Sequence, residues 1–567
     1  MIVLGLNHGE IISSAAVYRD GRIVAAACEE RFTREKKTKA FPQKAILALL
    51  NHCELTFGDL DFVAQGWNPG AYWIKYNPLL SASRTQREHY LYTIPDNLFN
   101  LTERTPPNWI EMNFDGDSGM PPIFYLQHHL CHAANAFYLS SFEEAAILTC
   151  DFQGEFESTS MCMGRGNKIE RMGEANIPNS LGLLYATITE FLGYRPDHDE
   201  WKVMALSAFD VDASDFEDRM LKTLSFGDGN LELDQTYFKG AIVNQPHLYT
   251  QKLVDLFGGR VGKRQEKPDE WHIKIAKALQ SVSEKIAFSM LERLYAETAC
   301  KNVCLGGGFF MNCVINGQVT EKTPFDNVYI SHSPGDSGNS LGAALYLAHQ
   351  IKGEKRAYGM SHSYLGVLYD DTGIERTLKR RRLSYEKCDD IADKVAELLA
   401  QGKVVAFFNG RAEFGERALG NRSILADPRS ADMKDKINSM IKYREPYRPF
   451  APAALGDKAS KFFHVGPDYE CLYMEKVVPV KEKYRDQLPA ITHVDGSGRL
   501  QTVSRECNPV FASIIEKFEA LTGYPIVLNT SFNIANEPIV ETPDDAISTF
   551  YNSGLEYLAV GKFLLRK

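Results

Sequence analysis

The sequence lacks several features that would quickly place it in a class of protein. None of its 11 cysteines forms a C-x-x-C pair, which excludes a zinc ribbon and gives no sign of a disulfide framework. No apolar run approaches the ~18 residues of a membrane span, and no G-x-x-x-x-G-K-S/T loop indicates a P-loop nucleotide site. The chain starts with the apolar run Ile2–Leu6, without the basic segment or cleavage site of a leader. We therefore expect a cytoplasmic protein with no membrane partner.

The sequence also has fewer basic than acidic residues. The chain has 63 Lys and Arg against 73 Asp and Glu, a net charge of −10, and no basic stripe offsets it, so we expect no nucleic-acid partner. The one basic run, 379–382, follows a predicted helix and reads as its solvated end. Ordinary globular usage, 44% hydrophobic and 24% charged over 567 residues, predicts two to four domains.

One arrangement of strands occurs twice in the first half of the chain. Apolar runs flank the tight-turn dipeptide Asp20-Gly21, and a second strand with its own hairpin follows later. The expected strands are Ala15–Tyr18, Arg22–Ala27, Ala145–Asp151, Thr159–Met163 and Ile169–Met172. This repeat predicts two related α/β halves, the organisation of the actin/Hsp70/sugar-kinase architecture.

The chain divides into two α/β parts. We predict a first domain over 1–355, a connector over 356–369 and a second domain over 370–567, in which Val404–Phe408 and Ile526–Leu528 are buried strands. The Pro- and Asn-rich segment 76–122 reads as an insertion with a role in acceptor binding or in forming a homodimer.

Two histidines and two aspartates suggest a metal site in the first part. His128 and His132 lie one helical turn apart, Asp151 ends an apolar strand, and Asp336 lies in a Gly-rich turn that opens a helix. Such a mixed N/O set suits Fe(II), Mn(II) or Zn(II). The alternatives are a structural histidine pair and a simple helix N-cap at Asp336.

A strand turns through three glycines at Gly306-Gly307-Gly308 and continues to Asn312. Glycines let the backbone approach a ligand closely, and the following amides can face a phosphate. Close packing of a helix on a strand also selects glycine, so this turn alone is weak evidence for a nucleotide site.

Six cationic side chains are concentrated among glycines, prolines and aromatics in the second part. Arg and Lys that converge on an irregular backbone hold small doubly charged oxyanions. The alternative is a salt-bridged loop held by Glu413, Glu416 and Glu445. The six residues are Arg411, Arg417, Arg422, Lys442, Arg444 and Arg448.

Taken in order, these motifs resemble the O-carbamoyltransferase family, whose members act on nodulation factors and on antibiotics such as tobramycin, cephamycin and novobiocin. The resemblance covers nearly the whole chain and rests most firmly on 415–423 and 444–452. It implies an actin/Hsp70-like (ASKHA, Kae1-like) N-terminal domain, shared with tRNA threonylcarbamoyl-adenosine transferases, and an α/β YrdC-like C-terminal domain.

The resemblance also implies a reaction. Carbamoyl phosphate and ATP give carbamoyl-adenylate and pyrophosphate in the C-terminal domain, and the metal-bearing domain passes the carbamoyl group to a small-molecule alcohol and releases AMP. We expect Fe(II) as the metal and Mg(II) with the ATP. By motif, Arg417, Lys442 and Arg448 are catalytic and, together with Arg499 and Asn529, bind carbamoyl phosphate. The implied nucleotide contacts are Gly307, Gly308, Asn312 and Lys202, and the implied metal ligands are His128, His132, Asp151 and Asp336.

The chain departs from the family pattern near its start. The family's His-Asp aligns near Ile11-Ile12, and this chain has His8-Gly9-Glu10 instead. His8 is our candidate for the catalytic base, and a plain loop residue is the equal alternative. Three other functions stay open: a tRNA threonylcarbamoyl transferase, a hydrogenase-maturation carbamoyltransferase, and a non-catalytic nucleotide-binding module. The fused anion domain, the acidic charge and the missing cysteine pairs favour the O-carbamoyltransferase.

Overall fold

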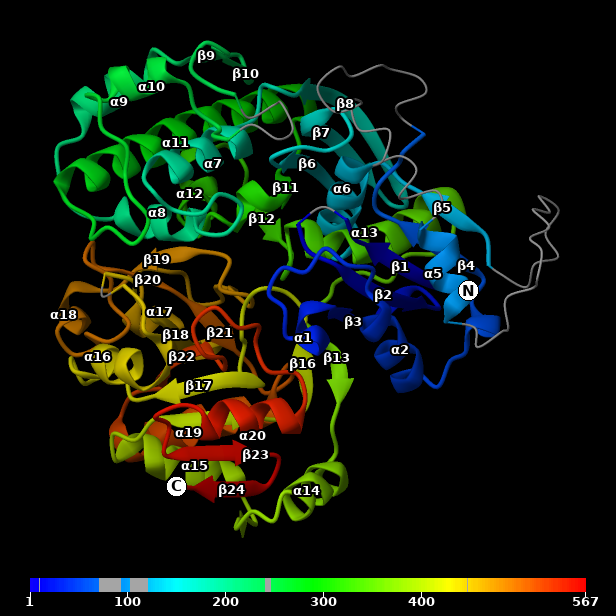
Figure 1. Cartoon of the computed structure of the whole chain (residues 1–567), viewed down its shortest axis with the longest axis vertical. Helices are drawn as coiled ribbons and strands as arrows, with labels where there is room; N and C mark the ends of the chain where they lie inside the picture. Colours follow the sequence, from blue (N-terminus) through cyan, green and yellow to red (C-terminus); the bar gives the residue numbers. More distant parts are fainter. Residues whose placement is uncertain (10, 71–92, 102–120, 240–245, 446) are drawn as a thin grey trace. The chain divides into compact units, whose positions relative to one another are not determined.

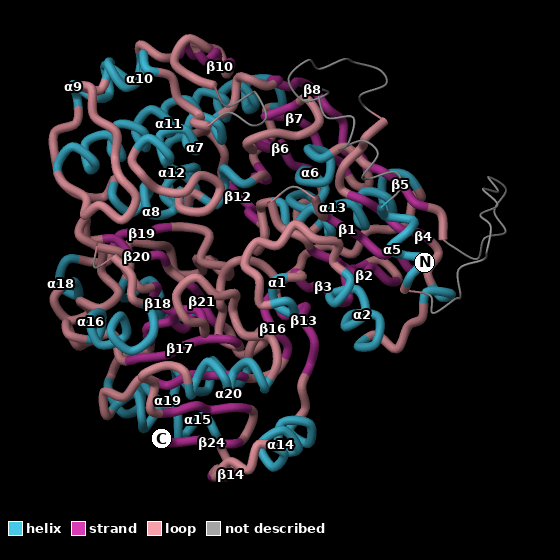
Figure 2. Tube along the Cα trace, viewed as in Figure 1, coloured by secondary structure: helices cyan, strands magenta, loops and turns pink. Residues whose placement is uncertain are grey.

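A computed structural model describes residues 1–9, 11–70, 93–101, 121–239, 246–445 and 447–567 (Figures 1 and 2). The chain forms two compact units. The first contains Met1–Glu29 and Lys37–Met360, and the second contains Glu30–Lys36 and Ser361–Lys567. Most of the segment 76–122, for which a role in acceptor binding or in forming a homodimer was predicted, lies outside the described residues.

Two five-stranded sheets with one topology form the centre of the first unit. The strand orders are β3-β2-β1-β4-β5 and β8-β7-β6-β11-β12; in each sheet the first three strands are antiparallel and the last two run parallel to the third. This duplication is the mixed α/β, actin/Hsp70-like architecture that the sequence predicts. The strands are β1 Ile2–Asn7, β2 Ser14–Arg19, β3 Arg22–Cys28, β4 Phe62–Gln65, β5 Ile123–Tyr125, β6 Glu144–Cys150, β7 Glu157–Arg165, β8 Lys168–Asn176, β11 Asn302–Gly306 and β12 Asn327–Ile330.

Both predicted hairpins are confirmed. β2 and β3 meet around Asp20 and Gly21, both of which have positive φ, and β7 pairs antiparallel with β8. The other elements of this unit are mostly helical: α2 Gln43–His52, η1 Phe57–Asp59, α5 Ile94–Asn100, α6 His128–Tyr138, α7 Leu181–Phe191, α8 Glu200–Leu206, α9 Ser214–Leu221, β9 Leu224–Gly227, β10 Asn230–Leu233, α10 Gln251–Leu256, α11 Glu270–Thr298, η3 Gly308–Met311, α12 Cys313–Lys322, η4 Asp336–Gly338, α13 Asn339–Leu345 and η5 Tyr346–Ile351.

Glycines allow α13 to pack closely on its neighbours. A Cβ at Gly342 would lie 1.9 Å from the Cys131 carbonyl of α6, and one at Gly5 of β1 would lie 1.9 Å from the Ser340 carbonyl. No larger residue fits these contacts. The close approach brings the start of α13 and the start of α6 to the same place.

An eight-stranded sheet forms the second unit, in the order β14-β24-β23-β15-β17-β22-β18-β21. Alternate residues enter two cores: Ala406, Phe408 and Ile424 pack into one, and Val405, Phe407 and Leu425 into the other. Both faces of the sheet are therefore buried. The strands are β14 Glu386–Lys387, β15 Val405–Phe408, β17 Arg422–Ala426, β18 Ala451–Leu455, β21 Gln501–Val503, β22 Ile526–Ser531, β23 Tyr557–Val560 and β24 Phe563–Arg566.

Two strand pairs and several helices complete this unit. The segment 356–369, expected to be a connector, contains β13 Tyr364–Leu368, which pairs with β16 Arg411–Glu413. The other elements are α1 Glu30–Thr33, α14 Asp371–Arg380, α15 Ile391–Ala400, α16 Met433–Ile437, η6 Asn438–Lys442, η7 Gly456–Lys458, α17 Ala459–Phe462, β19 Val477–Pro479, α18 Glu482–Arg485, β20 Ser497–Arg499, α19 Pro509–Thr522 and α20 Pro543–Tyr551. The YrdC-like character of this unit stays a prediction.

Candidate functional site

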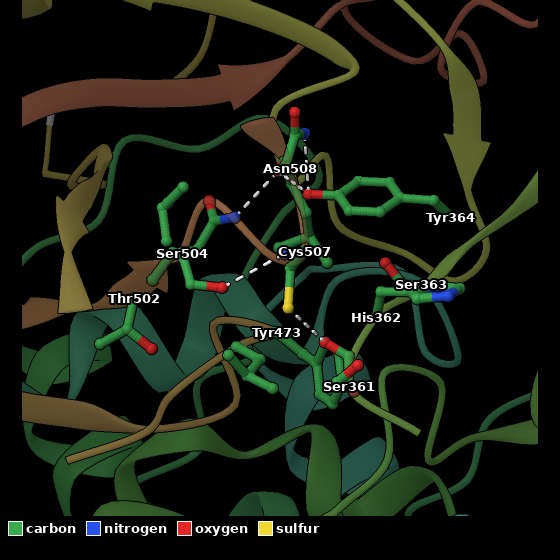
Figure 3. A pocket seen from close by; sticks show the side chains of 13 residues that line it. Ser361, His362, Ser363, Tyr364, Tyr473, Thr502, Ser504, Cys507 and Asn508 are labelled. Atoms are coloured by element: carbon green, nitrogen blue, oxygen red, sulfur yellow. Dashed lines mark hydrogen bonds between the residues drawn. The ribbon is translucent and has the colours of Figure 1, made fainter. Parts of the chain in front are cut away.

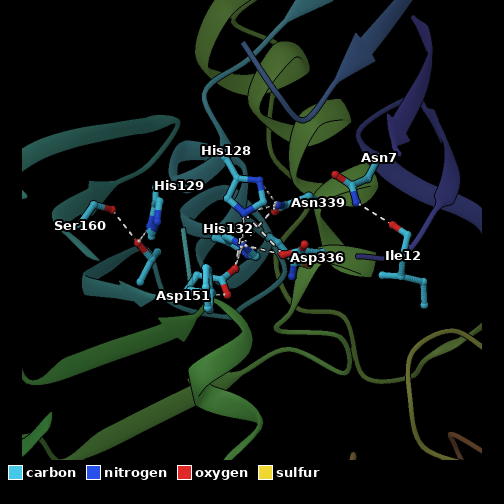
Figure 4. A network of polar contacts seen from close by, with 12 residues as sticks. Asn7, Ile12, His128, His129, His132, Asp151, Ser160, Asp336 and Asn339 are labelled. Atoms are coloured by element: carbon cyan, nitrogen blue, oxygen red, sulfur yellow. Dashed lines mark hydrogen bonds and ion pairs between the residues drawn. The ribbon is translucent and has the colours of Figure 1, made fainter. Parts of the chain in front are cut away.

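The four predicted metal ligands of the first unit lie together (Figure 4). His128 and His132 project from the first two turns of α6, and their Nε2 atoms are 3.0 Å apart. Asp151, directly after β6, places Oδ2 2.8 Å from Nε2 of His132 and 3.4 Å from Nε2 of His128. Oδ1 of Asp336 lies 3.5 Å and 3.6 Å from the same two nitrogens. Asp336 is not the N-cap of α13, which is Gly338.

The geometry of this group fits a divalent cation. All four ligand atoms lie within 4.8 Å of one another and all four residues are buried. Ligands bound at ~2.1 Å in adjacent positions stand ~3.0 Å apart, close to the observed separations. Although burial alone would raise the pKa of Asp151, the His128 and His132 rings hold it well below its usual value. An ionised carboxylate beside imidazole nitrogens is a donor set for Fe(II), Mn(II) or Zn(II).

Two polar residues next to this group were not predicted as site residues. Nδ2 of Asn339, the first residue of α13, lies 3.2 Å from Nδ1 of His128 and 3.3 Å from Nε2 of His132. The carboxylate of Glu155 accepts from the backbone amides of His128 and Asn68, and burial raises its pKa to about 7. The sequence could have indicated Asn339 as a site residue, because it lies three residues after Asp336 in the same Gly-rich turn.

The glycine turn packs directly against Asp151. Gly307 has a φ of +92°, and a Cβ there would lie 2.1 Å from the Cys150 carbonyl. At Gly308 a Cβ would lie 3.0 Å from Oδ1 of Asp151. Close packing therefore requires glycine at Gly307, and the same packing brings the turn to the metal ligands. Contact of Gly307 and Gly308 with a nucleotide stays a prediction.

Three other predicted residues of the first unit have local partners. Asn312 caps α12 by accepting from the Ile315 amide, and its Nδ2 donates to Gln280 at 2.9 Å. Lys202 pairs with Asp199 at 3.1 Å. His8 is buried after β1, with its ring 5.4 Å from that of Phe41. Their nucleotide and catalytic roles stay predictions.

The cationic residues of the second unit centre on a buried lysine. Lys442, 6% exposed, donates to Oγ of Ser531 at 3.2 Å and to Oδ1 of Asn533 at 2.8 Å, and also to the main-chain carbonyls of both residues. These acceptors are neutral, and no carboxylate pairs with Lys442 in the part of the chain that the structure describes. Burial, and then Arg444, Lys36 and Arg448, hold its pKa well below the usual value. A bound anion would favour the protonated form of this buried amine, so the surroundings of Lys442 favour the binding of an anion.

Arg444, Arg448 and Arg499 extend this positive region. Burial, and then Arg448 and Arg499, hold the pKa of Arg444 well below its usual value. Its guanidinium lies 3.7 Å from the Phe450 ring centre and donates to the Pro449 carbonyl at 3.3 Å. Glu445 offsets part of the charge by accepting from Arg448 at 3.2 Å. Arg499 ends β20. We refer to one set of residues as the cation cluster: Lys36, Lys442, Arg444, Arg448 and Arg499.

Arg417 lies in a turn that its neighbours hold in place. Oε1 of Glu413 accepts from the amides of Leu419, Asn421 and Arg422 at 2.7, 2.6 and 3.2 Å. Asn529 donates to the Ala418 carbonyl at 3.2 Å and to Oε1 of Gln501 at 2.8 Å. Within the described residues the Arg417 guanidinium itself makes no hydrogen bond or ion pair.

Two of the six cations proposed for the anion site bond to main-chain carbonyls. Arg411 donates to the carbonyls of Leu365 and Gly366 at 2.7 and 2.8 Å. Arg422 is fully buried, donates to the Asn409 carbonyl at 2.8 Å and stacks 3.6 Å from the Phe408 ring centre. Arg422 is fully buried and its guanidinium satisfies main-chain carbonyls, so its assignment to the anion site was wrong. The assignment of Arg411, which is partly exposed, stays a prediction. Glu413 binds amides and, among the described residues, does not form the ion pair of the alternative salt-bridged loop.

A pocket lies beside the Arg417 turn in the same unit (Figure 3). Asn508 donates to the Tyr364 hydroxyl at 3.0 Å and to Oδ1 of Asn421 at 2.9 Å, and Cys507 Sγ donates to the Ser361 carbonyl at 3.1 Å. None of the predicted site residues lines this pocket. The lining residues are Ser361, His362, Ser363, Tyr364, Leu419, Leu472, Tyr473, Gln501, Thr502, Val503, Ser504, Cys507 and Asn508.

Models of known protein families match both units of the chain. The family model "Carbamoyltransferase N-terminus" matches residues 3–345, and "Carbamoyltransferase C-terminus" matches residues 396–567. The chain belongs to the carbamoyltransferase family, and it is an enzyme that transfers a carbamoyl group. This excludes a non-catalytic nucleotide-binding module.

Relatives match over most of the chain. The uncharacterized protein sll1178 of Synechocystis is 35% identical, over 100% of this chain and 96% of its own length. Nodulation protein NolNO of Sinorhizobium fredii is 35% identical over 98% of this chain and 78% of its own. Nodulation protein NolO of Bradyrhizobium diazoefficiens is 38% identical over 78% and 79%. The solved structure of HypF from T. kodakarensis covers 62% of this chain and 48% of its own at 13% identity and a TM-score of 0.31, too low to support a conclusion.

The described helices include none that is both long and apolar enough to cross a membrane. All eleven cysteines are free thiols.

Proposed function

We propose that this carbamoyltransferase uses carbamoyl phosphate and ATP to form carbamoyl-adenylate, and then passes the carbamoyl group to a hydroxyl of a small molecule, a natural product or a sugar. The observation that supports this most is the buried Lys442, held among cations and neutral acceptors without a carboxylate partner in the described residues. A small dianion such as carbamoyl phosphate offsets that charge.

The first step of the proposed reaction consumes one water molecule. Water cleaves carbamoyl phosphate to carbamate and phosphate, and a carbamate oxygen then attacks the α-phosphorus of ATP and displaces pyrophosphate. Arg417 is our proposed contact for the negative charge of the carbamate and the phosphate. Its turn is held in place, and its guanidinium has no partner in the described part of the chain. Charge-assisted hydrogen bonds of this kind contribute ~1.5–3 kcal/mol each.

In the second step the acceptor hydroxyl attacks the carbamoyl carbon, the bond from that carbon to the adenylate oxygen breaks, and AMP leaves. His128, His132, Asp151 and Asp336 would hold a divalent cation, with Fe(II) as our proposal, that supplies Lewis-acid stabilisation of the leaving phosphate. The Gly307-Gly308 turn, packed on Asp151, is our proposed contact for that phosphate. His8 stays a candidate for the base that accepts the hydroxyl proton.

Product analysis tests this function. The full chain, loaded with Fe(II), would be incubated with ATP, Mg(II), ¹³C-labelled carbamoyl phosphate and a panel of amino sugars, chito-oligosaccharides and hydroxylated antibiotics. We expect an acceptor whose mass increases by one labelled carbamoyl group, in amounts equal to the AMP released. Labelled product formed equally well without ATP would contradict the adenylate route.

A further inference from the structure

A short segment from the first tenth of the sequence is packed in the second unit. The chain leaves the first unit after Glu29 and returns at Lys37, so Glu30–Lys36, which contains α1, belongs to the second unit. Seven residues cannot bury a core of their own. Their role has to come from what they contact, and one of those contacts is the turn that carries Arg417.

Arg31 holds the turn that carries Arg417. It is 3% exposed, and its Nη2 donates to the Gly415 carbonyl at 3.0 Å and to the Glu413 carbonyl at 3.4 Å. These carbonyls precede Arg417, whereas Glu413, Asn529 and Gln501 hold the residues that follow it. The backbone is thus fixed on both sides of Arg417, whose own side chain lacks a described partner. This is the geometry of a preorganised ligand-binding arginine.

Arg34, three residues further along the segment, binds a second loop. It donates to the Pro538 and Ile539 carbonyls at 2.7 Å each, and its Nε lies 3.8 Å from Asp545. These contacts anchor the segment without touching the Arg417 turn. Arg34 is therefore a matched control for Arg31: it has the same charge and lies in the same segment, but it holds a different loop.

We infer that the segment Glu30–Lys36 is a working part of the anion site of the second unit, in which Arg31 is a positioning residue that presents Arg417 to the dianion. This rests on the proposed function, because it assumes that the cation cluster binds carbamoyl phosphate.

Calorimetric titration of the full chain with carbamoyl phosphate, and with inorganic phosphate as a stable analogue, tests the inference. We expect Arg31→Gln to weaken binding about tenfold, since a flexible turn loses preorganisation, and to raise KM for carbamoyl phosphate more than it lowers kcat. Arg31→Lys, which can still donate to one carbonyl, should recover part of the affinity. Arg34→Gln should stay within about twofold of wild type. Equal losses in Arg31→Gln and Arg34→Gln would overturn the positioning role.

Arg31→Lys keeps the inference testable if Arg31→Gln does not fold, because a lysine can donate to only one of the two carbonyls that Arg31 binds. Arg31→Lys should weaken phosphate binding about threefold, and Arg34→Lys, in the loop contact of the same segment, should not. Equal affinities of these two variants would overturn the positioning role. Wild type that fails to bind carbamoyl phosphate at all would refute the proposed function itself. Binding that is lost in Arg417→Ala but kept in Arg31→Gln would refute this inference alone.

Discussion

Nε2 of His128 and Nε2 of His132 face each other at 3.0 Å inside the first unit. Each of these nitrogens also faces the carboxylates of Asp151 and Asp336. Two unprotonated ring nitrogens at this distance would face each other with their lone pairs. A proton or a metal ion therefore has to lie between them. The four converging donors favour the metal ion.

Loss of one donor should remove the metal. We expect His132→Ala and Asp336→Asn to lower the affinity for Fe(II) or Mn(II) by at least about 100-fold, because outer-sphere partners alone account for 10–100-fold. Metal per chain after dialysis, measured by mass spectrometry, checks this. His129→Gln is the control: His129 is the neighbour of His128 on α6, but its Nδ1 bonds to Thr149 at 2.7 Å. Full metal occupancy in His132→Ala would refute the site.

Anion binding by the second unit should take up a proton. In the free protein the pKa of Lys442 is held well below its usual value, and a bound dianion favours the ammonium. Affinity for sulfate, whose own charge is constant, should therefore fall as pH rises above the free pKa, by up to about tenfold per pH unit. Calorimetry in buffers of different ionisation enthalpy measures the proton uptake.

Lys442→Arg is the matched variant for that experiment, because a guanidinium stays charged. Its sulfate affinity should be flat over the same pH range. Wild-type binding without proton uptake would mean that Lys442 is already charged in the free protein, and the lowered pKa of its ammonium would be wrong.

Arg422 should matter for stability and not for binding. Arg422→Met leaves the carbonyls of Asn409 and Gly410 without their buried donor and loses the stacking on Phe408. We expect the free energy of unfolding to drop by about 3 kcal/mol, read from urea denaturation. Arg505→Met, on an exposed arginine paired with Glu516, should change it by less than about 0.5 kcal/mol. Equal stabilities would contradict the structural role of Arg422.

The metal group was predictable because its spacing has geometric meaning. Residues four apart on a helix share a face, as His128 and His132 do, and ligands gather where strands end, as at Asp151. The duplicated sheets followed from repeated hairpin signals in the same way. These are local rules, and they apply wherever a regular element positions the side chain.

In the second unit, such local rules do not predict contacts between residues that are far apart in the sequence. Nothing in the sequence separates Arg422, which binds carbonyls, from Arg417, which has no described partner, because the distinction depends on which turn folds back over each guanidinium. The assignment of Glu30–Lys36 to the second unit depends on contacts with residues nearly four hundred positions away, such as Gly415. In the first unit, the contact of Asn312 with Gln280 of α11 likewise depends on the tertiary fold.

The most direct test of the adenylate mechanism needs no acceptor. Purified protein with ATP and Mg(II) would be assayed for pyrophosphate release with and without carbamoyl phosphate, in wild type, Arg417→Ala, Arg448→Ala and the control Arg429→Ala. We predict release that depends on carbamoyl phosphate, survives in Arg429→Ala and is lost in the other two variants. Folded wild-type protein that binds ATP and carbamoyl phosphate but releases no pyrophosphate would contradict the mechanism.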